Sequence, residues 1–215
     1  MNEVVGLVGA GGFGSEVMPV LRFQLKDGQK KNYKTFFIDS NTTKKELNGV
    51  KIITEEDFLN SSYQTKHFNV AIADSQLREQ IARKYQENLC KPFSIISKNI
   101  NILDNVKFGQ GCIVFPNAFL TSNITIGDFF HSYHFVSIAH DCKIGDFVTV
   151  APGVMINGNV VIEDHAYIGS GAILKQGIRI GSNATIGMGA IVISDVEANT
   201  VVAGNPAKII RKNEK

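Results

Sequence analysis

A six-residue repeat runs through the second half of this sequence and limits how the chain can fold. From residue 96 onward every sixth residue is large and apolar, with Ser132 as the one exception. The full series is Ile96, Ile102, Phe108, Val114, Leu120, Ile126, Ser132, Ile138, Ile144, Val150, Ile156, Ile162, Ile168, Leu174, Ile180, Ile186 and Val192. The residue four places after each of these is mostly small or β-branched, as at Cys112, Ala118 and Val136. A fixed period of this kind is typical of a solenoid.

The fourth residue of each hexad predicts a corner in the chain. Thirteen of the seventeen residues at this position are Asn, Gly or Asp, which tolerate a left-handed backbone. The first and fifth residues of a hexad point the same way, because side chains alternate along a strand. No insertion breaks the register between residues 96 and 197. Short sides separated by regular corners predict a parallel β-helix, and we assign residues 93–215 to this all-β domain.

The first ninety residues follow a different pattern, in which short apolar runs alternate with segments of helical spacing. Strands are expected at 4–9, 35–39, 51–54 and 68–74, and helices at 15–25 and 76–89. Pro19 should shorten or kink the first helix, and Ser75 is the expected N-cap of the second. This alternation predicts a small Rossmann-like α/β domain with a parallel sheet over residues 1–92.

A glycine motif lies between the first strand and the first helix of that domain. Gly9, Gly11 and Gly14 satisfy G-x-G-x-x-G, and Asp39 ends the next strand. Glycines let the backbone approach a phosphate closely, and the helix N-terminus offers unpaired N–H groups. A plain tight turn from strand to helix is the alternative. The domain is too short for both halves of a dinucleotide fold, so a mononucleotide carrying a sugar fits better than NAD, and an NAD oxidoreductase is disfavoured.

Charge and cysteine content exclude several classes of protein. The formal net charge is +2 and no basic run is interleaved with aromatic residues, so no nucleic-acid partner is expected. Cys90, Cys112 and Cys142 lack metal-ligand spacing and are expected to be reduced, structural thiols. The sequence begins without a signal-peptide pattern and contains no apolar run long enough to span a bilayer. We therefore expect a cytoplasmic protein without a membrane partner.

The hexads and the ending VVAGNPAKIIRK closely resemble those of the hexapeptide-repeat acyltransferases, whose β-helix is triangular and left-handed. With a glycine loop in front and His140-Asp141 inside the repeats, the resemblance narrows to the sialic-acid O-acetyltransferases and the bacillosamine-type N-acetyltransferases of nucleotide-linked amino sugars. It implies an acetyl-CoA-dependent N-acetyltransferase that acts on a nucleotide-linked amino sugar of the 4-amino-4,6-dideoxy type. Such an enzyme would serve bacterial surface-polysaccharide or glycan biosynthesis.

Three of the five histidines fall within the stretch HSYHFVSIAHDC. His134 and His140 take the third position of consecutive hexads, which faces solvent. They should therefore lie on successive sides of the β-helix, roughly 15–20 Å apart given the rise of a strand. Two residues so far apart do not share a metal within one subunit, so no metal site is expected. A zinc site would need ligands from two subunits.

Departures from the repeat concentrate beside these histidines. Phe129, Phe135 and Phe147 occupy corner positions where bulky residues are disfavoured. Phe129 and Phe147 are eighteen residues apart and should stack on adjacent coils. Residues that break such local preferences tend to occur at functional sites. These aromatic residues mark a functional region, an interface that they seal, or both.

The resemblance implies a role for each histidine. His140 matches the general base, and Asp141 matches the acidic residue that orients and polarises it, although the bacillosamine enzyme has glutamate there. The base would take the proton of the sugar amine as its nitrogen attacks the thioester carbonyl, and backbone N–H groups would hold the oxyanion. His131 and His134 have no such match and are interpreted as acceptor-pocket or surface residues.

The resemblance also implies where the two substrates lie. The nucleotide-sugar is expected against Gly12, Phe13, Gly14, Asp39 and Ser40. Coenzyme A is expected in a groove between two helices, near Thr149, Gly158, Ser170 and Met188, and we add Lys208 and Arg211 as candidates for its phosphates. Gly158, one coil from His140, is expected to leave room for the thioester. A groove between neighbouring helices implies a homotrimer.

Two other functions stay open at this point. An O-acetyltransferase of sialic acid or a related sugar would share every feature except the use of the nucleotide loop. A non-catalytic ligand-binding or scaffold protein would need no coenzyme A. The amino sugar, the choice between UDP and dTDP and the acyl chain have no marker in the sequence.

Overall fold

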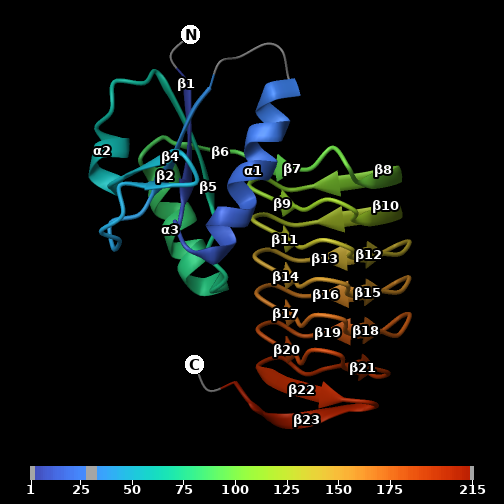
Figure 1. The fold of residues 1–215 in the computed structure, drawn as a ribbon. Helices are drawn as coiled ribbons and strands as arrows, with labels where there is room; N and C mark the ends of the chain where they lie inside the picture. Colours follow the sequence, from blue (N-terminus) through green and yellow to red (C-terminus); the bar gives the residue numbers. More distant parts are fainter. Residues whose placement is uncertain (1–2, 28–32, 214–215) are drawn as a thin grey trace. The chain divides into compact units, whose positions relative to one another are not determined.

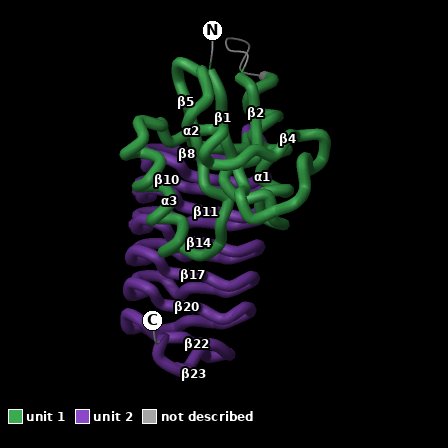
Figure 2. Tube along the Cα trace, turned by 90° about the vertical axis from the view of Figure 1, so that its left-hand side faces the viewer, with its two compact units in different colours: residues 1–97 green, residues 98–215 purple. Residues whose placement is uncertain are grey.

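The computed structural model describes residues 3–27 and 33–213, and the chain divides into two compact units. The first comprises residues 1–97 and the second residues 98–215 (Figure 2). The division falls a few residues after the boundary at 92 and 93 that the sequence indicates. The first unit is an α/β domain and the second is a stack of short parallel strands, so the predicted fold class is confirmed.

The first unit contains one six-stranded sheet in the order β3-β4-β2-β1-β5-β6, in which only the β3–β4 pair is antiparallel (Figure 1). Its strands are β1 (Glu3–Val8), β2 (Lys34–Ile38), β3 (Glu46–Leu47), β4 (Val50–Ile53), β5 (Thr65–Val70) and β6 (Lys91–Pro92). The helices are α1 (Gly12–Asp27), α2 (Glu55–Leu59) and α3 (Ser75–Glu87), and β7 (Ile95–Ile96) lies against α1. Within the described residues no helix is both long and apolar enough to cross a membrane.

The central strand β1 is buried on both faces and carries a glycine where a helix packs closely. A Cβ atom on Gly6 would lie 2.3 Å from the side chain of Ile38 and 2.7 Å from that of Phe58 on α2. Phe58 in turn lies against Tyr85 of α3, so α2 and α3 cover this face of the sheet. The other face receives α1, where a Cβ on Gly14 would lie 3.5 Å from Phe37.

The α2 helix was not predicted, although its start has a recognisable signal. Thr54 is the N-cap: its hydroxyl accepts a hydrogen bond from the Asp57 N–H, and the Asp57 carboxylate accepts one from the Thr54 N–H. This reciprocal pair is a capping box, which satisfies two otherwise free donors. The helix has only five residues, too few for a helical period to show in the sequence.

The start of α3 corrects two predictions. Its N-cap is Asp74 rather than Ser75, because the Asp74 carboxylate accepts hydrogen bonds of 3.0 Å from the N–H groups of Gln76 and Leu77. Residues 71–74, which lead into this cap, are not part of the strand, so β5 ends at Val70 rather than at residue 74.

The first helix is longer than predicted. It begins at Gly12, directly after the glycine loop, and continues through Pro19 to Asp27. Proline at this place removes one backbone hydrogen bond, and the helix continues past it nonetheless.

The second unit is a parallel β-helix whose strands form three rows. One row contains β9 (Ile113–Val114), β11 (His131–Ser132), β14 (Thr149–Val150), β17 (Tyr167–Ile168) and β20 (Thr185–Ile186). The second contains β12 (Ser137–Ile138), β15 (Met155–Ile156), β18 (Ile173–Leu174) and β21 (Ile191–Val192), and the third β13 (Lys143–Ile144), β16 (Val161–Ile162) and β19 (Arg179–Ile180). The longer strands β8 (Asn101–Phe108) and β10 (Phe119–Ile126) pair with each other, and β10 continues into both of the latter rows. Partners are eighteen residues apart, as His131 and Thr149 are, so each coil consists of three hexads.

The inside and the corners of the β-helix follow the hexad pattern. The first-position residues from Val114 to Val192, including Ser132, are at most 4% exposed. Every fourth-position residue from Asn105 to Gly189 has a positive φ, between 50° and 79°. The predicted corners are therefore confirmed, including the strained ones at Phe129, Phe135 and Phe147. An antiparallel hairpin of β22 (Thr200–Gly204) and β23 (Ala207–Lys212) follows the last coil.

Candidate active site

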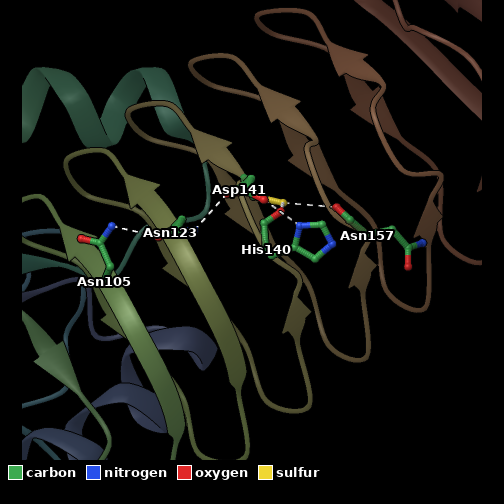
Figure 3. A network of polar contacts seen from close by, with 6 residues as sticks. Asn105, Asn123, His140, Asp141 and Asn157 are labelled. Carbon is green, nitrogen blue, oxygen red and sulfur yellow. Dashed lines mark hydrogen bonds and ion pairs between the residues drawn. The ribbon is translucent and has the colours of Figure 1, made fainter.

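His140 and Asp141 form a close pair at the corner that follows β12 (Figure 3). The Nδ1 atom of His140 lies 2.8 Å from Oδ2 of Asp141. Asp141 has a φ of 61°, and this left-handed corner aims its carboxylate back at the preceding imidazole. The side chains are 53% and 46% exposed, so the pair is open to a substrate. The sequence predicted this pair as base and orienting acid.

The charge on Asp141 decides which nitrogen of His140 is basic. Hydrogen bonds from His140 and, next, from Asn123 hold the pKa of the Asp141 carboxyl below its usual value, so it is ionised at neutral pH. An ionised carboxylate only accepts hydrogen bonds. The proton of a neutral His140 ring therefore lies on Nδ1, and Nε2 has the free lone pair.

Gly158 makes room for the imidazole itself. A Cβ atom at residue 158 would lie 2.6 Å from both Cε1 and Nε2 of His140, closer than any real contact. The His140 ring occupies the space that a side chain at residue 158 would fill, and the place of Gly158 beside the thioester stays a prediction. Gly158 acts as the platform on which the ring lies.

The aromatic corners form a stacked column elsewhere in the β-helix. The rings of Phe129 and Phe147 are parallel within 2°, with centroids 5.4 Å apart, as predicted. Below them the ring of His165 continues the stack at 5.3 Å from Phe147. Gly111 completes the column, since a Cβ there would lie 2.5 Å from the Phe129 ring. This column explains two of the unusual phenylalanines by stacking.

The other two predicted histidines lie apart from His140. His131 is completely buried on β11, so its interpretation as a surface residue is wrong. His134 is exposed and its ring meets that of Phe135 edge to face, with centroids 5.4 Å apart. Among residues 3–27 and 33–213, no three His, Cys, Asp or Glu side chains gather as ligands for one metal ion.

The glycine loop of the first unit contains glycines of two kinds. Gly9 has a φ of 101°, and a Cβ on Gly14 would lie 2.0 Å from the Gly9 carbonyl oxygen, so these two are required by the tight turn itself. A Cβ on Gly11 or Gly12 would meet nothing within 4 Å. Those two glycines leave the start of α1 open, as a phosphate site at a helix N-terminus needs.

A cavity of about 580 Å³ lies in front of this loop, at the carboxyl ends of β1, β2 and β5. In open α/β sheets ligands bind at this edge, where the strand order reverses. Its walls include the predicted Gly12, Phe13, Asp39 and Ser40, whereas Gly14 lies behind the loop. Four of the five residues predicted for the nucleotide-sugar therefore share one cavity.

Asp39 organises the loop around that cavity. Its Oδ2 accepts a hydrogen bond of 3.0 Å from the Ala10 N–H, and its Oδ1 accepts one of 2.9 Å from the Asn41 N–H. The Ser40 hydroxyl accepts a hydrogen bond of 3.3 Å from the N–H of Glu55. The second strand end and the start of α2 are thereby tied to the glycine loop.

Sequence reasoning missed a charged pair in the same cavity. Glu55 of α2 and Lys84 of α3 form an ion pair, and both line the cavity beside Tyr85. Burial and, next, the Glu55 carboxylate raise the pKa of Tyr85, which stays protonated. Leu77, Ile72 and Ile81 add an apolar wall. Charged groups beside an apolar slot are suited to a planar, polar ring such as a nucleobase.

The residues predicted for coenzyme A do not come together in one chain. Gly158 follows β15, as His140 follows β12 one coil earlier. Ser170 and Met188 instead precede β18 and β21, as His134 precedes β12, so they lie at the opposite ends of the strands in this row. Thr149 is 2% exposed on β14, in a different row. Lys208 and Arg211 lie on β23. Their roles stay predictions.

Comparison with known families gives matches to both units. Residues 5–85 match the model of the PglD N-terminal domain. Residues 141–176 match the bacterial transferase hexapeptide (six repeats), and residues 159–194 match the hexapeptide repeat of succinyl-transferase.

Individual proteins are similar over larger parts of the chain. WeeI from Acinetobacter baumannii AYE is 42% identical, with a TM-score of 0.91 over 97% of this chain and 100% of that one. The acetyltransferase domain of PglB from Neisseria gonorrhoeae FA1090, solved in complex with acetyl coenzyme A, is 28% identical, with a TM-score of 0.89 over 98% of this chain and 100% of that one. GDP-perosamine N-acetyltransferase from Escherichia coli O157:H7 is 40% identical over 141 residues, which span 66% of this chain and 64% of that enzyme.

Proposed function

Because this chain belongs to the hexapeptide-repeat acyltransferases that carry a PglD-type N-terminal domain, we propose that it is an acetyl-CoA-dependent N-acetyltransferase of a nucleotide-linked amino sugar. The His140-Asp141 pair is the observation that carries this proposal, because it supplies an oriented base in a solvent-open position. The PglB domain that binds acetyl coenzyme A and the GDP-perosamine N-acetyltransferase support the choice of the two substrates. We place the reaction in the cytoplasm.

In the proposed reaction the sugar amine attacks the carbonyl carbon of the thioester. A C–N bond forms, and the C–S bond to coenzyme A breaks when the tetrahedral intermediate collapses. Nε2 of His140 takes the proton that the nitrogen loses and passes it to the departing sulfur. Asp141 keeps the Nδ1 proton in place and stabilises the imidazolium that forms between these two steps. No metal takes part in this scheme.

The cavity at the glycine loop is the proposed nucleotide site. The open backbone at Gly11 and Gly12 suits the phosphates, and the slot beside Glu55 and Tyr85 suits the base. This cavity distinguishes the proposal from O-acetylation of free sialic acid, which would leave it without a ligand. A scaffold protein would need neither the cavity nor the His140-Asp141 pair.

We propose that the active enzyme is a homotrimer. The outward side chains of one row are mostly apolar: Phe119, Ser137, Met155, Ile173 and Ile191. Phe119 and Met155 remain 40% and 48% exposed, and exposed apolar side chains that gather in one row indicate an association surface. His140 lies at one end of these strands and His134 at the other. A second copy on this face would form, together with the first, the groove proposed for coenzyme A.

The proposal is tested by release of the coenzyme A thiol from acetyl-CoA in the presence of different acceptors. GDP-, UDP- and dTDP-linked 4-amino-4,6-dideoxy sugars and free sialic acids form the panel, with His140→Ala as the inactive control. We expect thiol release with a nucleotide-linked amino sugar, and a product that has gained one acetyl group as a base-stable amide. Release with sialic acid alone, giving a base-labile ester, would contradict the proposal.

A further inference from the structure

A column of polar corner residues leads to the His140-Asp141 pair from the coils before it (Figure 3). The Nδ2 atom of Asn105 lies 3.0 Å from Oδ1 of Asn123, and Nδ2 of Asn123 lies 3.1 Å from Oδ1 of Asp141. The three residues are eighteen positions apart and have φ values of 50°, 58° and 61°. Equal backbone conformation on successive coils therefore aims their side chains along one line.

The last hydrogen bond of this column completes the anchoring of Asp141. Its Oδ2 faces Nδ1 of His140, and its Oδ1 accepts from Asn123. A carboxylate that is bound through one oxygen can still turn about its Cβ–Cγ bond, because this torsion has a broad energy minimum. With both oxygens engaged, the plane of the carboxylate is fixed, and so is the direction in which it holds the imidazole.

The first hydrogen bond of the column decides which way the Asn123 amide faces. An amide presents an acceptor oxygen on one side and a donor nitrogen on the other. Asn105 donates to the Asn123 oxygen, which leaves the Asn123 nitrogen pointing at Asp141. The reversed amide would set its oxygen against the negative charge of the carboxylate.

We propose that Asn123 is a positioning residue for the acetyl transfer, which acts through Asp141 on the tautomer and orientation of His140. Asn105 supports it by fixing the Asn123 amide. This inference rests on the proposed function, since it assigns to Asn123 a role in the chemistry of His140. A purely structural role, in which asparagines only stabilise left-handed corners, predicts different results in the following experiment.

The experiment compares three variants in the full-length enzyme. Asn123→Gly removes the amide and keeps a residue that tolerates positive φ. Asn123→Asp keeps the shape but places a second carboxylate against Asp141. Asn159→Gly is the matched control, because Asn159 has a φ of 59° one coil beyond Asp141 and its side chain has no hydrogen bond to Asp141 among the described residues. Thermal unfolding establishes that each variant is folded.

We expect Asn123→Gly to lower kcat about 10-fold, the factor that one charge-assisted hydrogen bond corresponds to, with little change in the KM for acetyl-CoA. Asn123→Asp should lower kcat further although it is closer in shape to the native residue. Asn159→Gly should change kcat less than about 2-fold. If Asn123→Asp were more active than Asn123→Gly, or if Asn159→Gly lost as much activity, the column would be structural only.

A second readout does not depend on any substrate. In the native protein the ¹⁵N chemical shifts of His140 should report a protonated Nδ1 and an unprotonated Nε2 at pH 8. Asn123→Gly should shift them toward a mixture of the two tautomers. Unchanged shifts in this variant would overturn the proposal even if acetyl transfer had been demonstrated. If the native protein acetylated no sugar, these shifts would still test the column by themselves.

Discussion

At the scale of single residues, the proposed chemistry concentrates in His140. A sugar ammonium cannot attack a carbonyl until it has lost its proton, and loss of a general base typically costs about 10²–10⁴ in rate. We therefore expect His140→Ala to lower kcat by that order with little change in the KM for acetyl-CoA. Asp141→Asn should have a smaller effect, because it keeps the shape of the pair but weakens its polarisation. Steady-state kinetics provide the measurement.

His134→Ala is the matched comparison for that experiment. His134 holds the same place in the preceding hexad, is also exposed, and has no carboxylate behind it, since Phe135 follows. We expect its effect to fall on the KM for the acceptor. If His140→Ala had a normal kcat and His134→Ala had almost none, the active site would lie at the corner of His134 and not at that of His140.

Gly158 offers a test of the imidazole's position that leaves the base itself in place. The Cβ of alanine would lie 2.6 Å from Cε1 and Nε2, so the ring must turn away from the geometry it shares with Asp141. We expect Gly158→Ala to lower kcat at least about 10-fold while the melting temperature changes by only a few degrees, because the close contacts of the new Cβ are with the half-exposed His140 side chain, which can turn away. An unchanged kcat would mean that the ring has no required position over Gly158.

At the scale of elements, the sequence predicted the structures that follow a repeated pattern and missed those that depend on a few residues. The hexads located every corner from Asn105 to Gly189, because the same conformation recurs at each turn of the β-helix. The α2 helix was missed because five residues cannot show a period, and its capping box at Thr54 was the available signal.

Glu55 and Lys84 are 29 residues apart and meet only because α2 and α3 cover one face of the sheet. Asn123 lies eighteen residues before Asp141, so the period of the coil could have revealed it.

The pairing of α2 with α3 leads to a prediction about the nucleobase. Uracil, thymine and guanine present a ring N–H beside a carbonyl, which a carboxylate and an ammonium group match. Cytosine and adenine present an acceptor nitrogen beside an amino group instead. If Glu55 and Lys84 contact the base, GDP, UDP or dTDP should bind more tightly than CDP or ADP, and Glu55→Gln should remove most of this difference. Isothermal titration of the five diphosphates measures it.

The control for this element is a second ion pair on the same helix. Glu79 and Arg83 of α3 form an exposed pair that does not line the cavity. We expect Arg83→Gln to leave all five affinities within about 2-fold, as surface substitutions usually do. A loss of preference in Arg83→Gln as large as that in Glu55→Gln would indicate a general effect of charge rather than contact with the base.

At the scale of the whole molecule, two outward rows of the β-helix differ in character. The row that passes through Met155 is mostly apolar, whereas Val161 lies between Lys143 and Arg179 in a charged row. If the apolar row is the trimer interface, Met155→Lys should place an unpaired charge in it, which is strongly destabilising for association. We expect the native protein to have the mass of three 23.5 kDa chains in light scattering, and Met155→Lys to become monomeric and lose acetyl transfer while its circular dichroism is retained.

Val161→Lys, one row away, should remain trimeric and active. A native mass of a single chain would remove the groove proposed for coenzyme A, and a trimeric Met155→Lys would place the interface on another face.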